Sequence, residues 1–235
     1  AGSADLTARL MGQWLSDRLG QPVVVENRPG AATNLATEAV ARAPADGYTL
    51  LLVAPANAIN ATLFEKLNHN FLRDIAPVAG INRFPNVMEV NPSVPVKTVP
   101  EFIAYAKANP GKLRYGSGGV GGALHIAVEM LKLSTGADIV HVPYRSGAQA
   151  ATDTISGQID MVSMGLASAR VAEGGKLRVL AQTGPARHPL FAEVPTTAEV
   201  GWPEVRMETW FGLSAPPNLP DAIVARLARE TEAVA

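Results

Sequence analysis

The sequence predicts an α/β protein of two domains, in which strands and helices alternate along the chain. Apolar residues recur at helical spacing over Leu6–Leu19, and strand-sized apolar runs follow at Val23–Val25 and Thr49–Val53. Strands separated by helical segments of about ten to fifteen residues indicate βαβ units and largely parallel sheets. These strands are too many for one small sheet. We therefore expect the chain to cross into a second domain within Asn91–Lys97 and to return within 202–209.

The two crossings divide the chain into a discontinuous first domain, residues 1–92 and 208–235, and a continuous second domain, residues 93–207. Capping boxes mark Thr98–Glu101, which opens a helix reaching about Asn109, and Thr196–Glu199. Further helices are expected at about 34–43, 57–67, 123–133, 149–156 and 166–172, and from Pro220 onward. Further strands are expected at 75–81, 86–90, 113–115, 139–144, 159–163, 176–182 and 208–214.

The composition excludes several classes of function. Lys and Arg total 20 and Asp and Glu total 21, so a formal net charge of −1 offers no basic surface for nucleic acid or an anionic membrane. The chain has no cysteine, which excludes disulfides, thiolate metal sites and cysteine nucleophiles. The longest apolar runs, such as Leu50–Pro55, have the length of a strand, so no membrane span is expected. No signal peptide is visible in the sequence.

A glycine-rich segment, Tyr115–Gly122, follows a predicted strand and opens a predicted helix. Five of the seven positions from Gly116 to Gly122 are glycine. Glycine lets the backbone approach a ligand closely, and the free amides and dipole of a helix N-terminus favour an anion. A flexible turn is the alternative interpretation. The combination of five glycines with the strand-to-helix context favours an anion-binding loop.

The same glycines match the dinucleotide fingerprint, because Gly116, Gly118 and Gly121 satisfy G-x-G-x-x-G. That fingerprint requires an acidic residue at the end of the next strand, about twenty residues further on. Asp138 instead precedes the predicted strand, and Arg145–Gly147 follow it. The Lys and Ser/Thr that follow the last glycine of a phosphate-binding P-loop are absent too. A small anion such as a carboxylate therefore fits this loop better.

Two further segments are candidates for the same kind of ligand. Gly2, Ser3, Ala4 and Asp5 are small or polar and stand before the first amphipathic helix, although Ser3 or Asp5 could be a plain helix cap. Asn57 follows the predicted strand that ends near Val53, where ordinary turn chemistry explains it almost as well.

The sequence shows no catalytic or metal-binding arrangement, and no cofactor is expected. Its histidines, His69, His125, His141 and His188, form no H-E-x-x-H motif. His125 lies one turn into the helix after the glycine loop, where its ring could reach a ligand; a structural histidine is the alternative. No G-x-S-x-G motif occurs, so Ser117 is expected to donate a hydrogen bond, not to act as a nucleophile.

Taken together, the motifs resemble the Bug-type receptors of tripartite tricarboxylate transporters along essentially the whole chain. The most specific stretch is Gly20–Ala31, which reads GQPVVVENRPGA. The other matching segments are Pro44–Leu51, Pro110–Ser117, Val140–Tyr144, Gly157–Asp160, Gly175–Arg178, Val194–Thr196 and Trp210–Gly212.

This resemblance implies a two-lobed periplasmic-binding-protein (Venus flytrap, type II) fold with a ligand cleft between the lobes. It also implies export to the periplasm by a cleaved signal, a small carboxylate ligand, the membrane subunits of a secondary transporter as partners, and no enzymatic activity. The ligand is an organic acid or an acidic amino acid in such receptors. No nucleic acid partner is implied, and the receptor is expected to act as a monomer.

The resemblance also implies which residues bind the ligand. Family members hold the carboxylate through backbone amides, small polar side chains and water, without an arginine clamp. Carried over by position, the ligand-binding residues are Gly2, Ser3, Ala4, Asp5, Asn57, Ser117, Gly118, Gly119, Gly121, His125, Ser163 and Met164. The family normally opens with an Ile- and Val-rich strand that ends in a Pro/Gly-rich loop, and continues for a few tens of residues beyond Ala235. Both segments are expected to be missing from this sequence.

Two other functions stay open at this point. The ligand-sensing domain of a transcription regulator can have a similar two-lobed fold, but it would be joined to a helix-turn-helix and a basic surface. An NAD-dependent oxidoreductase could use the glycines at 116–121, and the position of Asp138 argues against it.

Overall fold

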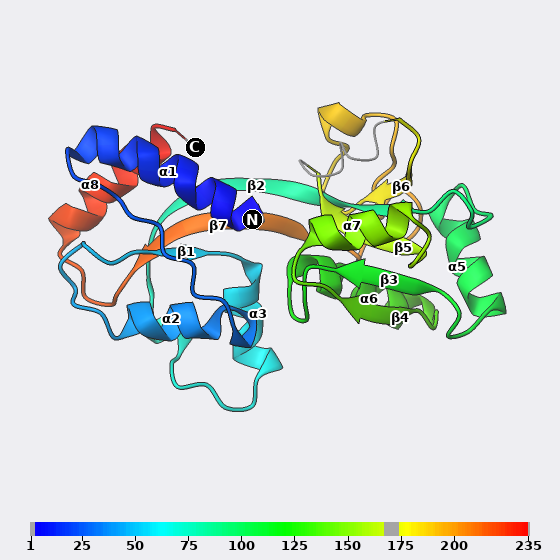
Figure 1. Cartoon of the computed structure of the whole chain (residues 1–235), viewed down its shortest axis with the longest axis horizontal. Coiled ribbons are helices and arrows are strands. Elements are labelled where there is room, and N and C mark those ends of the chain that lie inside the picture. The colour runs from blue at the N-terminus through cyan, green and yellow to red at the C-terminus, as the bar shows by residue number, and fades with distance from the viewer. Residues whose placement is uncertain (1–2, 167–173, 235) are drawn as a thin grey trace. The chain divides into compact units, whose positions relative to one another are not determined.

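The structure is a computed structural model that describes residues 3–166 and 174–234. It divides into two compact units (Figure 1): unit 1 comprises residues 1–83 and 210–235, and unit 2 comprises residues 84–209. The sequence predicts these boundaries at 92 and 208. In the structure the boundaries fall inside two strands, β2 (Ala76–Val90) and β7 (Glu208–Ala215), and not at a loop between elements.

The described residues of unit 1 form five α-helices and one short 3-10 helix around short strands. The helices are α1 (Ser3–Leu19), η1 (Ala31–Thr33), α2 (Asn34–Ala41), α3 (Pro55–Leu63), α4 (Phe71–Asp74) and α8 (Asp221–Glu232). Strand β1 (Leu51–Val53) pairs with β7 in antiparallel register, Val53 opposite Gly212. Gly212 lies tightly between its neighbours, because a Cβ there would lie 3.2 Å from the carbonyl oxygen of Ala79 on β2. The three strands are thus in close contact.

Helices α1 and α8 join the two ends of the described chain within unit 1. The indole Nε1 of Trp14 donates to the carbonyl oxygen of Glu230 at 2.7 Å, and Arg18 forms an ion pair with the Glu230 carboxylate at 2.9 Å. Met11 and Leu15 are buried along α1. Since Trp14 and Glu230 lie more than two hundred residues apart, unit 1 is completed only by the last segment of the chain.

The predicted strand Val23–Val25 is wrong, because these residues form no strand. They keep the alternation of a strand: Val23 and Val25 lie against Gly12 of α1, whereas Val24 is 87% exposed. The backbone N–H of Val23 donates to the hydroxyl of Ser16 at 2.8 Å. A strand exists only when a neighbouring strand takes its backbone hydrogen bonds. Among the residues that the structure describes, no strand pairs with this segment.

Unit 2 contains one mixed sheet covered by helices. The helices among its described residues are α5 (Val99–Ala108), α6 (Ala123–Thr135), α7 (Gly147–Ile155) and the short 3-10 helix η3 (Pro189–Phe191). Its other strands are β3 (Arg114–Ser117), β4 (Val140–Pro143), β5 (Met161–Gly165) and β6 (Arg178–Gln182). Strand β2 lies between β5 and β6, and β5 continues the sheet to β3 and then β4.

The expectation of largely parallel sheets is wrong. Strand β3 is parallel to β4 and β5, as βαβ connections require, but β2 is antiparallel to both β5 and β6. In unit 1, β1 and β7 are antiparallel too. The reason is that β2 and β7 pass directly from one unit into the other, and no crossover helix sets their direction. The predicted runs 75–81 and 86–90 are accordingly one continuous strand.

The two faces of the unit 2 sheet hold separate apolar clusters. Met88, Val90 and Met161 belong to one cluster, which also includes residues of α5 and α6 such as Phe102 and Leu131. On the other face, Val87, Val162 and Met164 form a second cluster with Ala150 and Ala151 of α7. Alternate residues of each strand thus point to opposite faces, and this places Ser117 at the end of β3 on the α6 side.

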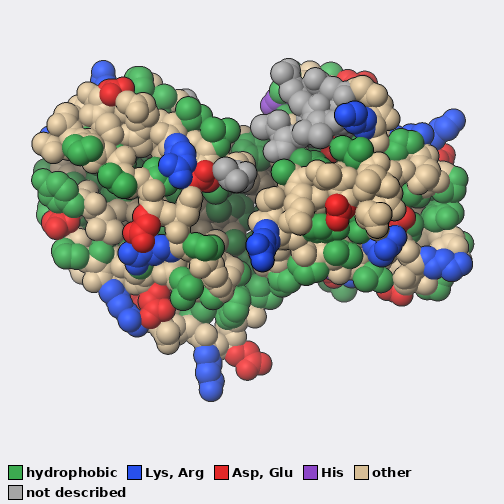
Figure 2. Space-filling view, viewed as in Figure 1, with side chains coloured by type: hydrophobic (Ala, Val, Ile, Leu, Met, Phe, Trp, Pro, Cys, Tyr) green, Lys and Arg blue, Asp and Glu red, His purple; other side chains and the backbone are tan. Residues whose placement is uncertain are grey.

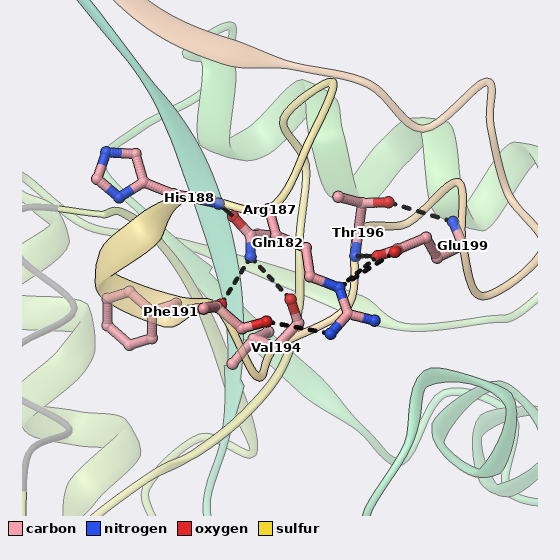
Figure 3. Close-up of polar contacts among 8 residues, drawn as sticks. Gln182, Arg187, His188, Phe191, Val194, Thr196 and Glu199 are labelled. Atoms are coloured by element: carbon pink, nitrogen blue, oxygen red, sulfur yellow. Dashed lines mark hydrogen bonds and ion pairs between the residues drawn. The ribbon is translucent and has the colours of Figure 1, made fainter.

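The segment after β6 is held by polar contacts, shown in Figure 3. The side-chain amide of Gln182 donates to the carbonyl oxygens of Phe191 and Val194, at 3.0 and 2.8 Å. The predicted capping box forms both of its hydrogen bonds: Glu199 N–H donates to the Thr196 hydroxyl at 3.2 Å, and Thr196 N–H to the Glu199 carboxylate at 2.7 Å. Only turns come after it, so these bonds fix a loop and not a helix.

Two remaining expectations concern helices. The helix expected at 166–172 lies outside the described residues, apart from Leu166, which is buried. Within the described part of the chain, no helix combines the length and the apolar character that crossing a bilayer demands.

Candidate functional site

The candidate site is the glycine loop of unit 2, which runs from the end of β3 to the start of α6. Gly119 and Gly121 have φ angles of 122° and 81°, a conformation that side chains rarely allow. Gly118 lies against the next loop, where a Cβ would approach the backbone nitrogen of Gly147 to 3.3 Å. The loop therefore needs glycine for its backbone conformation at two positions and for close contact at a third.

The N-terminus of α6 has no side-chain cap. Its N-cap residue is Gly122, whereas Thr98 and Ser146 cap the neighbouring helices α5 and α7 through their hydroxyls. The first amides of a helix otherwise lack acceptors, and the helix dipole adds partial positive charge there. The 13-residue helix α6 consequently presents its N-terminal amides beside a loop whose backbone conformation depends on glycine. This arrangement suits an anion.

Ser117 organises the start of the loop. It is completely buried, and its hydroxyl lies 2.7 Å from Nε2 of His141 on β4. The same oxygen accepts from the N–H of Gly119 at 3.3 Å and lies 3.1 Å from the Gly119 carbonyl, to which it can donate. Ser117 thus links the glycine loop to the neighbouring strand.

His125 closes the other end of the loop. Its Nδ1 accepts a hydrogen bond from the N–H of Gly121 at 3.2 Å, and its ring lies 4.3 Å from that of His141, centroid to centroid. His141 in turn stacks on Tyr115 at 4.7 Å. Burial lowers the pKa of both histidines, that of His141 to about 4, so both rings are neutral at pH 7.

A charged pair on α6 lies beside these rings. The hydroxyl of Tyr115 donates to the Glu129 carboxylate at 2.7 Å, and Lys132 contacts the same oxygen at 2.8 Å. Burial and the Glu129 carboxylate raise the pKa of Tyr115, which stays protonated. Burial acts to raise the pKa of Glu129, but Lys132 and Tyr115 lower it overall.

Ser163 and Met164, also predicted to bind the ligand, lie on β5. Ser163 is completely buried, and its hydroxyl has no hydrogen-bond partner among the described residues. Met164 points to the opposite face and packs in the apolar cluster under α7. The structure therefore places Met164 in the core of unit 2, and Ser163 on the strand next to β3 with an unused polar atom.

The other predicted residues belong to unit 1. The predicted loop Gly2–Asp5 differs in the structure, because α1 already begins at Ser3 and includes Ala4 and Asp5; Gly2 lies outside the described residues. The Asp5 carboxylate accepts from Asn27 Nδ2 at 2.7 Å and pairs with Arg9 at 3.0 Å, and these contacts lower its pKa. The Asp5 carboxylate in the first turn of α1 is therefore already bonded to other side chains of the protein.

Asn57 is buried in α3 and uses both ends of its amide within unit 1. Its Nδ2 donates to the Thr37 hydroxyl at 2.8 Å, and its Oδ1 accepts from the N–H of Ala54 at 2.8 Å. These contacts anchor the start of α3 to α2. Asn57 thus has a structural role that accounts for its position.

Of the predicted residues, the structure brings together Ser117, Gly118, Gly119 and Gly121 in the loop and His125 in the first turns of α6. His141 belongs to the same cluster and was missing from the prediction. It reaches the site because it lies directly opposite Tyr115 in the register of β3 and β4, and the pairing of two distant strands cannot be read from local sequence.

The Ser117–His141 contact has the length of a nucleophile–base pair, but it lacks the rest of such a site. Ser117 is buried, and Glu129 is already bonded to Tyr115 and Lys132 and does not orient His141. A pKa of about 4 makes His141 a poor base at pH 7. Among the described residues, no cluster of three or more histidine and acidic side chains is arranged to hold a metal ion.

Comparisons with known proteins agree with the architecture. Residues 7–234 match the model of the tripartite tricarboxylate transporter family receptor. Protein BugT of Bordetella pertussis is 35% identical over 232 residues, which cover 97% of this chain and 71% of BugT. The structure titled "R. palustris Rpa4515 with adipate" is 35% identical with a TM-score of 0.91, covering 99% of this chain and 78% of that one.

A second solved structure, MatC from Rhodopseudomonas palustris with bound malate, is 29% identical with a TM-score of 0.91 and covers 100% of this chain and 80% of that one. These relatives support neither a transcription regulator nor an oxidoreductase. On the face drawn in Figure 2, basic and acidic side chains are interspersed. The predicted α/β, two-lobed periplasmic-binding-protein fold and the Bug-type resemblance are both confirmed. The chain belongs to the receptor family of tripartite tricarboxylate transporters.

Proposed function

We propose that this chain captures a small organic acid in the periplasm, through a carboxylate bound at the glycine loop of unit 2. It delivers the acid to the membrane subunits of a tripartite tricarboxylate-type transporter, works as a monomer and catalyses no reaction. The observation that carries the proposal is the N-terminus of α6, which comes after a loop held in glycine-only conformations and has no side-chain cap.

Family membership supports the kind of ligand. MatC holds malate and Rpa4515 holds adipate, and both molecules are small dicarboxylates. Glu129 and Lys132 on α6 contact Tyr115 and form an ion pair with each other. Recognition of the anion is proposed to depend on the backbone amides of the loop and on nearby hydroxyl and imidazole groups, a chemistry that tolerates different acids. The ligands of the relatives guide the choice of compounds for a screen.

A binding screen tests the proposal. We expect adipate, malate or a related acid to raise the melting temperature of the full chain in proportion to the logarithm of its concentration, and NADH to leave it unchanged. Isothermal titration calorimetry then measures the affinity of each acid that stabilises the chain. Stabilisation by NADH together with none by any organic acid would overturn the receptor assignment.

A matched pair of variants tests whether the ligand binds at the glycine loop. Val120 lies in the loop and Leu133 near the other end of α6, and both are exposed apolar side chains. In Val120→Glu a carboxylate at the helix N-terminus should repel or replace the ligand and weaken binding about tenfold or more, or ~1.4 kcal/mol. Leu133→Glu adds the same charge near the far end of the helix and should keep the affinity. Equal affinities in both variants would exclude this loop as the site.

A further inference from the structure

The hydrogen bond between Gly121 and His125 determines the protonation of the ring. An N–H group can only donate, so Nδ1 of His125 must accept with a free lone pair. Neutral His125 therefore carries its single proton on Nε2. The N–H of Gly121, one of the loop amides that could meet an anion, is occupied by the side chain of His125.

Protonation of His125 is incompatible with this bond. A proton on Nδ1 converts the acceptor into a donor, and two donors facing each other at 3.2 Å repel. The Gly121 amide and the Nδ1–H group then both need an acceptor, and a carboxylate offers two acceptor oxygens. We infer that His125 is a proton-dependent switch of the glycine loop: the neutral ring occupies the Gly121 amide, and the protonated ring releases it for an anion. This inference rests on the proposed function of the loop.

The groups around the ring of His125 determine the pH at which it takes up a proton. His125 faces Glu129 and Lys132 on its own helix, His141 on β4 and, behind His141, Tyr115 on β3. Burial lowers the pKa of His125, the Glu129 carboxylate raises it, and Lys132 lowers it. His141 is held neutral by burial, and its contact with Ser117 does not involve the Gly121 amide. His125 is therefore the ring that takes up the proton.

Proton uptake and anion binding favour each other. Protonation of His125 frees the Gly121 amide for an anion, and a bound anion accepts hydrogen bonds from that amide and from the protonated ring. The affinity for an anion should increase as the pH falls, by up to about tenfold per unit while the free receptor is neutral at His125 and the complex is protonated. His141 acts as a positioning residue, since it holds Ser117 and the stacked ring while His125 changes state.

Nuclear magnetic resonance on the ligand-free full chain tests the switch without any ligand. The amide signal of Gly121 and the ring signals of His125 should move with one common midpoint during a pH titration. Lys132→Gln should move that midpoint up and Glu129→Gln should move it down, whereas a purely structural histidine would show no linked change at Gly121. A Gly121 amide that does not respond when His125 titrates would overturn the inference.

A second measurement connects the switch to binding and uses adipate as the probe. His125→Gln retains a side-chain acceptor for Gly121 but cannot be protonated. The ionisation of adipate itself affects both proteins equally, so the ratio of wild-type to variant affinity should fall as the pH rises from about 5 to 8. Equal pH profiles would overturn the inference. If adipate does not bind at any pH, the proposed ligand class fails, and the Gly121 titration still decides whether the switch exists.

Discussion

Tyr115 and His141 lie directly opposite each other on the parallel strands β3 and β4, and their rings stack with centroids 4.7 Å apart. This pairing places His141 beside Tyr115, so that His141 reaches both Ser117 and His125. The rings of Tyr115, His141 and His125 consequently form a stack beside the glycine loop. Changes to this stack should alter the stability of unit 2 and the loop together.

Removal of the Tyr115 hydroxyl tests the link between the stack and α6. Tyr115→Phe keeps the ring but removes the hydrogen bond to the Glu129 carboxylate, so we expect a loss of about 2 kcal/mol in the free energy of unfolding. Tyr48→Phe is the matched control, because Tyr48 is 86% exposed and the change should stay within about 0.5 kcal/mol. Urea unfolding followed by circular dichroism measures both. A neutral Tyr115→Phe would show that the hydroxyl contributes nothing to stability.

Two glycines of the loop should respond unequally to alanine. Gly119 has a φ of 122°, so Gly119→Ala should cost about 1–3 kcal/mol through backbone strain. Gly122 has a φ of −74°, and a Cβ there would make an ordinary 3.7 Å contact, so Gly122→Ala should cost less, at most about 1 kcal/mol, because alanine is a poorer N-cap than glycine. Thermal unfolding of both variants gives the comparison. Equal effects would contradict the assigned loop conformation.

The buried carboxyl group of Glu89 should make stability depend on pH. Glu89 lies on β2, is completely buried, and has no hydrogen-bond partner for either oxygen among the described residues. Burial raises its pKa to about 8. The unfolded chain releases this proton near the ordinary pKa of 4.5, while the folded chain keeps it up to about pH 8. Stability from this group is therefore complete at low pH and decreases between these values, by up to about 1.4 kcal/mol per unit.

Glu89→Gln isolates that contribution. The amide cannot ionise, so the difference between wild type and variant in the free energy of unfolding should shift in favour of the variant as the pH rises from about 5 to 8. Glu204→Gln, at an exposed position in the same unit, should leave the pH profile of the wild type unchanged. A pH-independent difference at Glu89 would mean that the carboxyl group is ionised or hydrated in the folded protein.

Local signals in the sequence predict those parts of the molecule that local chemistry determines. The capping box at Thr98–Glu101 opens α5 as expected, and the glycine pattern marks the turn into α6 correctly. The capping box at Thr196–Glu199 forms its hydrogen bonds but starts no helix, because no apolar helical stripe continues from it in a packed position. Caps thus predict where a chain turns more reliably than whether a helix begins there.

The misses concern pairing between distant segments. Val23–Val25 has the composition of a strand, yet its edge finds no partner among the described residues, and β2 is antiparallel because it arrives directly from unit 1. His141 joined the site only through the register of β3 and β4. Strand pairing depends on backbone hydrogen bonds between residues far apart in sequence, which no local pattern reports.

The route of the chain has a consequence for its biosynthesis. Unit 2 is one uninterrupted stretch, residues 84–209, whereas unit 1 needs β7 and α8 from the last segment, residues 210–235. The chain is delivered from its N-terminal side, so the stretch of unit 2 is complete before those residues arrive. Unit 2 can therefore pack first, while Trp14 and Arg18 still lack Glu230. Unit 1 should accordingly be the later of the two units to fold.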